Sequence, residues 1–147
     1  MSKPTDIPPL KIVLDSNVYI AAALNPDGLM YRIVLDSAAQ KLAIYTASEE
    51  ILLEIQNKLE TKLLFERSEI IPWLGQLRQV VQIVYPTQSL RVVERDPDDN
   101  KILECAVEAA ADLIITADKD LLVLKIYVGI KIIHPNSFKY VFPSLRH

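Results

Sequence analysis

The chain has 147 residues, of which half are apolar and 24% are charged, and this composition predicts one globular domain with a substantial core. No apolar run reaches the length of a membrane-spanning helix, and the single cysteine, Cys105, excludes an internal disulfide or a zinc site of several cysteines. The net charge of −3 does not attract nucleic acid, so such a partner needs a local basic patch or metal ions.

Residues 1–9 are polar and rich in proline, and they lack the charged-then-apolar order of a signal peptide. We therefore expect a flexible tail, a single domain over residues 10–147, and a cytoplasmic protein.

The elements expected along the chain alternate between strands and helices. Strands are predicted at residues 11–15, 41–47, 112–117 and 129–135, and a broken helix followed by a short strand is predicted at 68–86. Helices are predicted at residues 16–24, 29–40, 49–64 and 96–111, and a turn leads into a short helix within 116–125. This alternation predicts an α/β fold with a mainly parallel central sheet and helices on both faces.

The predicted helix at 49–64 begins after the sequence Thr46–Glu49, which has the form of a capping box. Its residues Ile51, Ile55, Leu59 and Leu63 fall on one side, which we expect to face the core.

Acidic residues follow the predicted strands at the places where sites form in parallel sheets. Asp15 ends the first strand, Asp118 follows the strand at 112–117, and Asp96–Asp99 begin the helix that leads into that strand. Because sites in open parallel sheets form beyond the carboxyl ends of the strands, these acids are expected to meet at one rim.

The sequence Asp96–Asn100, DPDDN, also has the form of a helix start. Asp96 is expected as the N-cap, Pro97 as the first helical residue, and Asp98 as a first-turn acid that complements the helix dipole. Asp99 differs, because it falls in the apolar stripe one turn ahead of Ile102. A carboxylate on that stripe is costly unless it is paired or binds a cation, which favours a functional role.

The other strand-end acids have two interpretations each. Asp15 is either an N-cap for the next helix or a site residue, and Ser16 or Asn17 would cap equally well. Asp118 and Asp120 are either turn and cap acids or part of a metal site. Convergent carboxylates raise one another's pKa unless a cation neutralises them, and hard oxygen ligands favour Mg²⁺ or Mn²⁺.

Three further residues have ordinary structural interpretations. His134 is expected to be a capping or surface residue, because no second ligand accompanies it. Cys105 is expected to be a small core residue, and Trp73 is expected to serve packing or an interface.

Three segments of the chain resemble the PIN domain family, and especially the VapC-like toxins of bacterial toxin–antitoxin pairs. The resemblance rests on IVLDSNV near the start, SEEILLEIQNKL in the middle, and the long segment from Asp96 to Phe138. It covers almost the whole chain after the first nine residues. It implies a PIN-like three-layer α/β/α fold.

The resemblance also implies a ribonuclease site with four acids around Mg²⁺ or Mn²⁺. Matched by position, the acids are Asp15, Glu54, Asp99 and Asp118. Asp15, Asp99 and Asp118 would bind the metal, and Glu54 would orient or deprotonate the attacking water. Supporting positions are Ser16, Asn17, Thr116 and Asp120. Glu54 rests on the resemblance alone, since helical periodicity places it at the flank of the apolar face, with Glu50 as a competitor one turn earlier.

Basic residues near these acids are candidate phosphate contacts, with solvated surface charge as the alternative for each. Lys101 and Lys119 are the leading candidates, and Lys58, Lys62 and Arg95 are further ones. The implied partners are an RNA substrate, a cognate antitoxin and a second copy of the chain. The apolar-rich residues 63–77 are either an interface or a part of the local core.

Other function classes stay open or are disfavoured by particular positions. A PIN-fold RNA-binding or scaffold protein with little turnover is one alternative, and a structure-specific processing nuclease is another. A haloacid-dehalogenase-like phosphatase requires a second acid where this chain has Asn17. With only three glycines, the chain lacks a glycine-rich phosphate loop.

Overall fold

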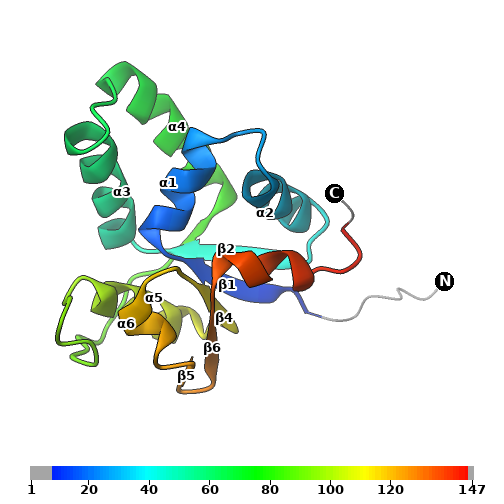
Figure 1. Ribbon diagram of the computed structural model, residues 1–147, viewed down its shortest axis with the longest axis vertical. Helices are drawn as coiled ribbons and strands as arrows, with labels where there is room; N and C mark the ends of the chain where they lie inside the picture. Colours follow the sequence, from blue (N-terminus) through cyan, green and yellow to red (C-terminus); the bar gives the residue numbers. More distant parts are fainter. Residues whose placement is uncertain (1–7, 146–147) are drawn as a thin grey trace.

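The computed structural model describes residues 8–145, which contain a six-stranded sheet (Figure 1). The strands are β1 (Leu10–Leu14), β2 (Ala43–Ala47), β3 (Gln82–Ile83), β4 (Leu113–Ile115), β5 (Ile126–Tyr127) and β6 (Ile130–Ile133). Their order is β3-β2-β1-β4-β6-β5, and every neighbouring pair is parallel except β5 with β6. The predicted α/β fold with a mainly parallel sheet is confirmed.

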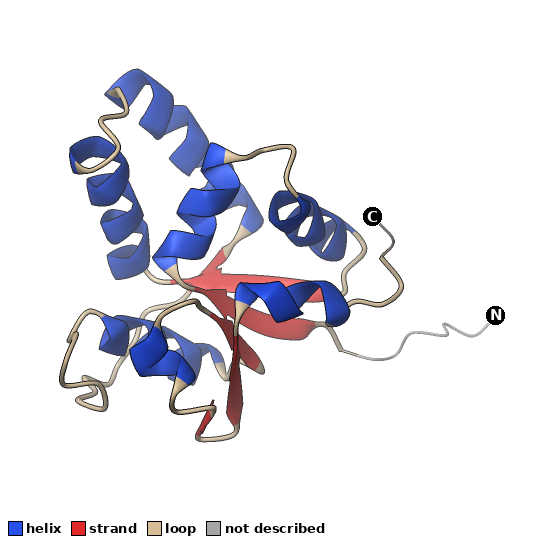
Figure 2. Cartoon of the chain, in the orientation of Figure 1, coloured by secondary structure: helices blue, strands red, loops and turns tan. Residues whose placement is uncertain are grey.

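Helices flank this sheet on both faces (Figure 2). They are α1 (Ser16–Leu24), α2 (Leu29–Ala39), α3 (Glu49–Thr61), α4 (Arg67–Val80), α5 (Asp99–Ala109), α6 (Lys119–Leu122) and the 3₁₀ helix η1 (Pro135–Tyr140). In the view of Figure 1, α1 to α4 lie above the strands, and α5 and α6 lie below them. The expected tail at residues 1–9 falls mostly on residues 1–7, which lie outside the described residues.

The core is centred on the two middle strands, whose side chains are covered on both faces. Ile12 and Val13 of β1 and Ile114 and Ile115 of β4 are completely buried. Continuous apolar strands of this kind are typical of parallel sheets between helix layers. Cys105 of α5 is also buried in the core, as predicted, and burial raises the pKa of its thiol to about 12.

Two local predictions for α3 are wrong. Ser48, rather than Thr46, is the N-cap, and its hydroxyl accepts a hydrogen bond from the Ile51 backbone N–H at 3.3 Å. Thr46 cannot cap the helix because it lies within β2. The helix ends at Thr61, so Leu63 falls outside it and is 40% exposed instead of facing the core.

The break predicted in the helix of residues 68–86 does not occur. Residues 67–80 form the single helix α4 with Pro72 inside it, at the cost of one backbone hydrogen bond. A capping box at its start, between Glu66 and Glu69, compensates by satisfying backbone N–H groups.

The C-terminal region contains two elements that the sequence pattern did not predict, β5 and η1. β5 and β6 are joined by Val128 and Gly129, whose φ angles are 47° and 82°. Two positive φ angles characterise the type I′ hairpin turn, which strongly prefers Asn-Gly. Because this turn has the sequence Val-Gly, the sequence pattern does not predict the hairpin. His134 caps η1, because its Nδ1 accepts a hydrogen bond from the Asn136 backbone N–H at 3.0 Å. This agrees with its predicted capping role.

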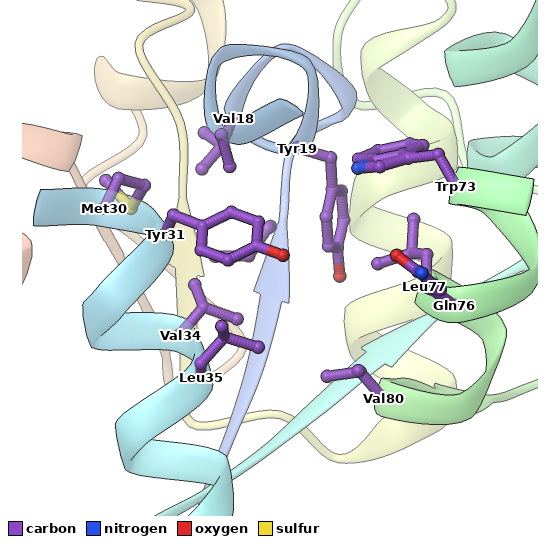
Figure 3. A pocket seen from close by; sticks show the side chains of 12 residues that line it. Val18, Tyr19, Met30, Tyr31, Val34, Leu35, Trp73, Gln76, Leu77 and Val80 are labelled. Atoms are coloured by element: carbon purple, nitrogen blue, oxygen red, sulfur yellow. The ribbon is translucent and has the colours of Figure 1, made fainter. Parts of the chain in front are cut away.

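An apolar cavity of about 70 Å³ lies among α1, α2 and α4 (Figure 3). Tyr19, Tyr31 and Trp73 extend into the same space from three different helices. Burial raises the pKa of the Tyr19 phenol, and its hydroxyl is buried without a hydrogen-bond partner among the described residues. Within residues 8–145, no helix is both long and apolar enough to cross a membrane.

Candidate metal centre

Asp15 and Thr116 meet because β1 and β4 are paired in parallel. Leu14 is opposite Ile115 in the register, so the residue after each strand reaches the same edge of the sheet. The Thr116 hydroxyl donates to Asp15 Oδ2 at 2.7 Å, and the Asp15 backbone N–H donates to the Ile115 carbonyl at 3.0 Å. Asp15 is only 6% exposed. The carboxylate is therefore held in one position at the strand end.

Asp118 is placed by the turn that follows β4. Its backbone N–H donates to the Thr116 hydroxyl at 3.0 Å, and the same hydroxyl donates to Asp15. Thr116 therefore positions both Asp15 and Asp118. One Asp118 oxygen accepts a hydrogen bond from the Asp120 backbone N–H at 2.8 Å and caps α6. The capping interpretation of Asp118 is thus correct.

Asp99 lies at the start of α5 and is 6% exposed, in agreement with its place on the apolar stripe. Asp96, Asp99 and Asp118 each present an oxygen within 4.8 Å of the others. Burial, followed by the nearby Asp118, Asp96 and Asp15, raises the pKa of Asp99 to about 8. Among the described residues, Asp99 Oδ2 has no hydrogen-bond partner.

Asp96 was expected to be the helix N-cap, and this expectation is wrong. The helix begins at Asp99, and Pro97 and Asp98 form a turn in front of it. Asp96 instead holds that turn, since its Oδ1 accepts from the Asp98 N–H at 3.2 Å and its carbonyl accepts from the Asp99 N–H at 3.0 Å. The turn brings Asp96 into the acidic cluster at the expected rim, although its sequence pattern favoured a capping role.

Polar side chains of α5 hold the loop that precedes Asp96. Glu108 accepts hydrogen bonds at 2.9 Å from the backbone N–H and the hydroxyl of Thr87. Glu104 accepts one from the Leu90 N–H at 2.8 Å. These acids therefore bind a loop backbone rather than facing solvent only, and they help to position Asp96.

Glu54 faces α1 from the neighbouring helix α3. Ser16 Oγ hydrogen-bonds to a Glu54 carboxylate oxygen and lies 3.3 Å from Asp15 Oδ1. Ser16 thus links Asp15 to Glu54, whereas Glu50 is exposed. The structure also pairs Glu54 with Lys58 at 2.9 Å and brings Asn17 within 3.1 Å of the Lys58 ammonium.

A pocket of about 300 Å³ lies beside the acids, between α3 and the start of α5. Its lining contains three lysines and three acids, namely Lys58, Lys62, Lys101, Glu50, Glu54 and Asp98. Lys101, a leading phosphate candidate, is therefore near the acidic rim. Lys119 is exposed on α6 and is not among the residues of this pocket.

The cluster of Asp96, Asp99 and Asp118 fits a hard divalent cation. All three residues offer carboxylate oxygens, the ligands that Mg²⁺ and Mn²⁺ prefer. Asp99 has a buried oxygen without a partner among residues 8–145, and its raised pKa shows that its ionised form is costly at this rim. A bound cation would lower the cost of ionising Asp99 and would give its unpartnered oxygen a partner.

A family model described as PIN domain matches residues 11–120. The chain belongs to the PIN domain family. PIN domains are generally nucleases and use divalent metal ions, in keeping with the acidic cluster.

Known proteins similar to this PIN domain come from several organisms. Uncharacterized protein MJ1680 of Methanocaldococcus jannaschii is 39% identical over 120 residues, which cover 79% of this chain and 76% of that protein. VapBC2 of Rickettsia felis, solved with a DNA fragment from its promoter, contains a chain with a TM-score of 0.61 at 14% identity, covering 85% of this chain and 98% of that one. The PIN domain endonuclease Utp24 has a TM-score of 0.54 at 19% identity, with 87% and 86% coverage.

Proposed function

We propose that this PIN domain is an endoribonuclease that hydrolyses RNA phosphodiester bonds with Mg²⁺ or Mn²⁺. The observation that carries the proposal is the meeting of Asp96, Asp99 and Asp118 at one rim, with a buried Asp99 oxygen that has no partner. Three acids from two segments of the chain are costly to bring together, and cation binding explains that cost.

Each residue of the site has a separate proposed role in the reaction. Asp96, Asp99 and Asp118 would hold the ion. Asp15, which the family resemblance also assigns to the metal, would complete the site from the end of β1, where Thr116 fixes it with a 2.7 Å hydrogen bond. When bound, the ion supplies Lewis acidity and a counter-charge for the phosphate. Glu54 would orient the attacking water or accept its proton. Asp120 supports Asp118, because its backbone N–H donates to the Asp118 carboxylate. Asn17 supports the Lys58–Glu54 pair, because its side-chain oxygen accepts from the Lys58 ammonium.

Lysines of the pocket between α3 and α5 would guide the RNA backbone to the acids. Lys101 and Lys62 lie in the same pocket as Glu54, so a strand held there reaches the acidic rim. Lys119 would contact RNA only outside this pocket.

The test is cleavage of single-stranded RNA by the purified full-length chain. We expect cleavage with Mg²⁺ or Mn²⁺, none with EDTA, and strong loss in Asp15→Asn and Asp99→Asn. Intact RNA with both metals across varied sequences would favour the alternative of a PIN-fold RNA-binding or scaffold protein.

We further propose that the chain is the toxin of a toxin–antitoxin pair, on the basis of its similarity to the VapBC2 structure. A small antitoxin protein would then bind the chain, and co-expression with the product of an adjacent short gene is the test. The similarity to the Utp24 endonuclease supports the second candidate, a processing nuclease. Cleavage of flapped DNA in preference to single-stranded RNA would favour that candidate.

Residues 63–77 are the proposed homodimer interface. Two large apolar side chains there, Leu64 and Ile71, are 78% and 65% exposed. Sedimentation of the wild type beside Leu64→Glu/Ile71→Glu tests this assignment. A dimer that becomes a monomer in the double variant supports it, and a wild-type monomer contradicts it.

A further inference from the structure

Lys58 occupies a cage of oxygen atoms at one end of the acidic rim. Its ammonium lies 2.9 Å from Glu54 Oε2, 3.1 Å from Asn17 Oδ1 and 3.3 Å from Ser16 Oγ. A lysine ammonium has three N–H donors, and these three contacts use all of them. The oxygens come from two helices, α1 and α3, which lie next to each other in Figure 1.

This arrangement differs from an ordinary ion pair between neighbouring turns of a helix. Glu54 and Lys58 do have the common spacing of four residues, but only 23% and 24% of their side chains are exposed. The cage also includes Ser16, which reaches Asp15. Carboxylate, amide and hydroxyl oxygens together form a donor set that a hard metal ion would otherwise use.

The other end of the rim has acids without a paired cation. Asp96, Asp99 and Asp118 share a position within 4.8 Å, yet none of them forms an ion pair with a lysine or arginine of residues 8–145. Asp99 keeps an oxygen without any partner there. One half of the rim thus contains its own cation, and the other half lacks one.

We propose that Lys58 takes the place of a second metal ion, so that each chain binds one divalent ion, at Asp96, Asp99 and Asp118. A divalent ion at Glu54 would meet the Lys58 ammonium at hydrogen-bond distance, and like charges so close repel strongly in a partly buried site. Lys58 is a positioning residue, which holds Glu54, Ser16 and Asn17 in the geometry that an ion would impose. This inference rests on the proposed metal-dependent function and specifies the composition of its site.

The test counts Mn²⁺ ions bound per chain, by electron paramagnetic resonance of free Mn²⁺ during titration of the full-length protein. We expect one ion in the wild type and in Lys58→Arg, which keeps the charge. We expect two ions in Lys58→Met, because the emptied oxygen cage becomes available. Lys62→Met is the matched control, four residues later at the C-cap of α3 and in the same pocket, and it should bind one ion.

Two results would overturn the proposal: two ions bound to the wild type, or one ion bound to folded Lys58→Met. Circular dichroism of each variant establishes that it is folded. Lys58→Gln, which also removes the charge and should bind two ions, serves as the second variant if Lys58→Met does not fold. RNA cleavage is scored separately. If the wild type cuts RNA with two ions bound, this inference fails and the nuclease function stands. If the wild type binds one ion and does not cut RNA, the nuclease function fails and the inferred ion count stands.

Discussion

Two buried polar groups in residues 8–145 lack a hydrogen-bond partner, and they lie in contrasting regions. Asp99 Oδ2 is at the acidic rim, where other carboxylates surround it. The Tyr19 hydroxyl is beside the apolar cavity of Figure 3, where Trp73 and Leu77 are among its neighbours. An unpartnered polar atom thus indicates a ligand site only where its neighbours offer compatible ligand atoms.

The strongest way to test this contrast is to neutralise the acid. Asp99→Asn should reduce divalent-dependent RNA cleavage by at least about a hundredfold, because metal stabilisation of the phosphoryl charge contributes several kcal/mol. Gel analysis of cleavage rates at saturating Mg²⁺ checks this. Activity within a few-fold of the wild type would remove Asp99 from the proposed site.

The second prediction concerns pH, because burial and neighbouring carboxylates raise the pKa of Asp99 into an accessible range. The pKa of Asp99 is raised from 3.8 to about 8 in the folded protein. The folded state therefore retains a proton that the unfolded state has lost, so the free energy of unfolding in EDTA should be greatest below pH 4 for this group and fall as pH rises towards 8. Each pKa unit corresponds to about 1.4 kcal/mol.

Urea unfolding at a series of pH values measures this effect, with Asp99→Asn as the control. The variant should lack the decline, and saturating Mn²⁺ should reduce it in the wild type. Identical pH slopes in both proteins would show that Asp99 does not titrate there.

The third prediction uses Asn100, a buried polar residue beside Asp99 whose hydrogen bonds are satisfied. Its Oδ1 accepts from the Val92 and Val93 N–H groups, and its Nδ2 donates to the Val93 carbonyl at 2.8 Å. Asn100→Ala should lower the free energy of unfolding by about 2–3 kcal/mol, because these buried groups lose their partners. It should also weaken Mn²⁺ binding, since the loop leading to Asp96 loosens.

Thermal unfolding and Mn²⁺ titration together check this prediction. A loss of stability with unchanged Mn²⁺ affinity would mean that Asp96 is positioned independently of the loop.

The smallest expected effect is at the cavity. Tyr19→Phe removes a buried hydroxyl without a partner and should raise stability by about 1 kcal/mol or less, with no change in RNA cleavage. Chemical denaturation measures the change. A clear loss of stability would show that the hydroxyl has a partner in solution, and the contrast with Asp99 would then weaken.

The sequence predicted those parts of the fold and site that depend on periodicity and strand ends. The apolar run before Asp15 and the stripe that contains Asp99 predicted a buried strand and a buried carboxylate, and both are observed. Glu54 lies at the flank of its helix, so periodicity alone did not select it, and its link to Ser16 depends on the packing of α1 against α3.

Other features depend on geometry that a linear pattern does not contain. Asp96 was assigned to capping because a capping residue and a cluster member have the same residue type, and only the turn before α5 distinguishes them. The sequence did not predict the Lys58 cage, because a glutamate followed four residues later by lysine is an ordinary surface pattern. The β5–β6 hairpin was missed because its turn uses Val128 where asparagine is usual.

The most direct measurement is anomalous X-ray diffraction from crystals of the protein grown with Mn²⁺. The account predicts an ion coordinated by Asp99 and Asp118, at the roughly 2.0–2.2 Å distances typical of small hard cations, with the Lys58 ammonium still beside Glu54. Crystals that contain Mn²⁺ elsewhere but none at these acids would contradict the shared metal centre on which the proposed nuclease depends.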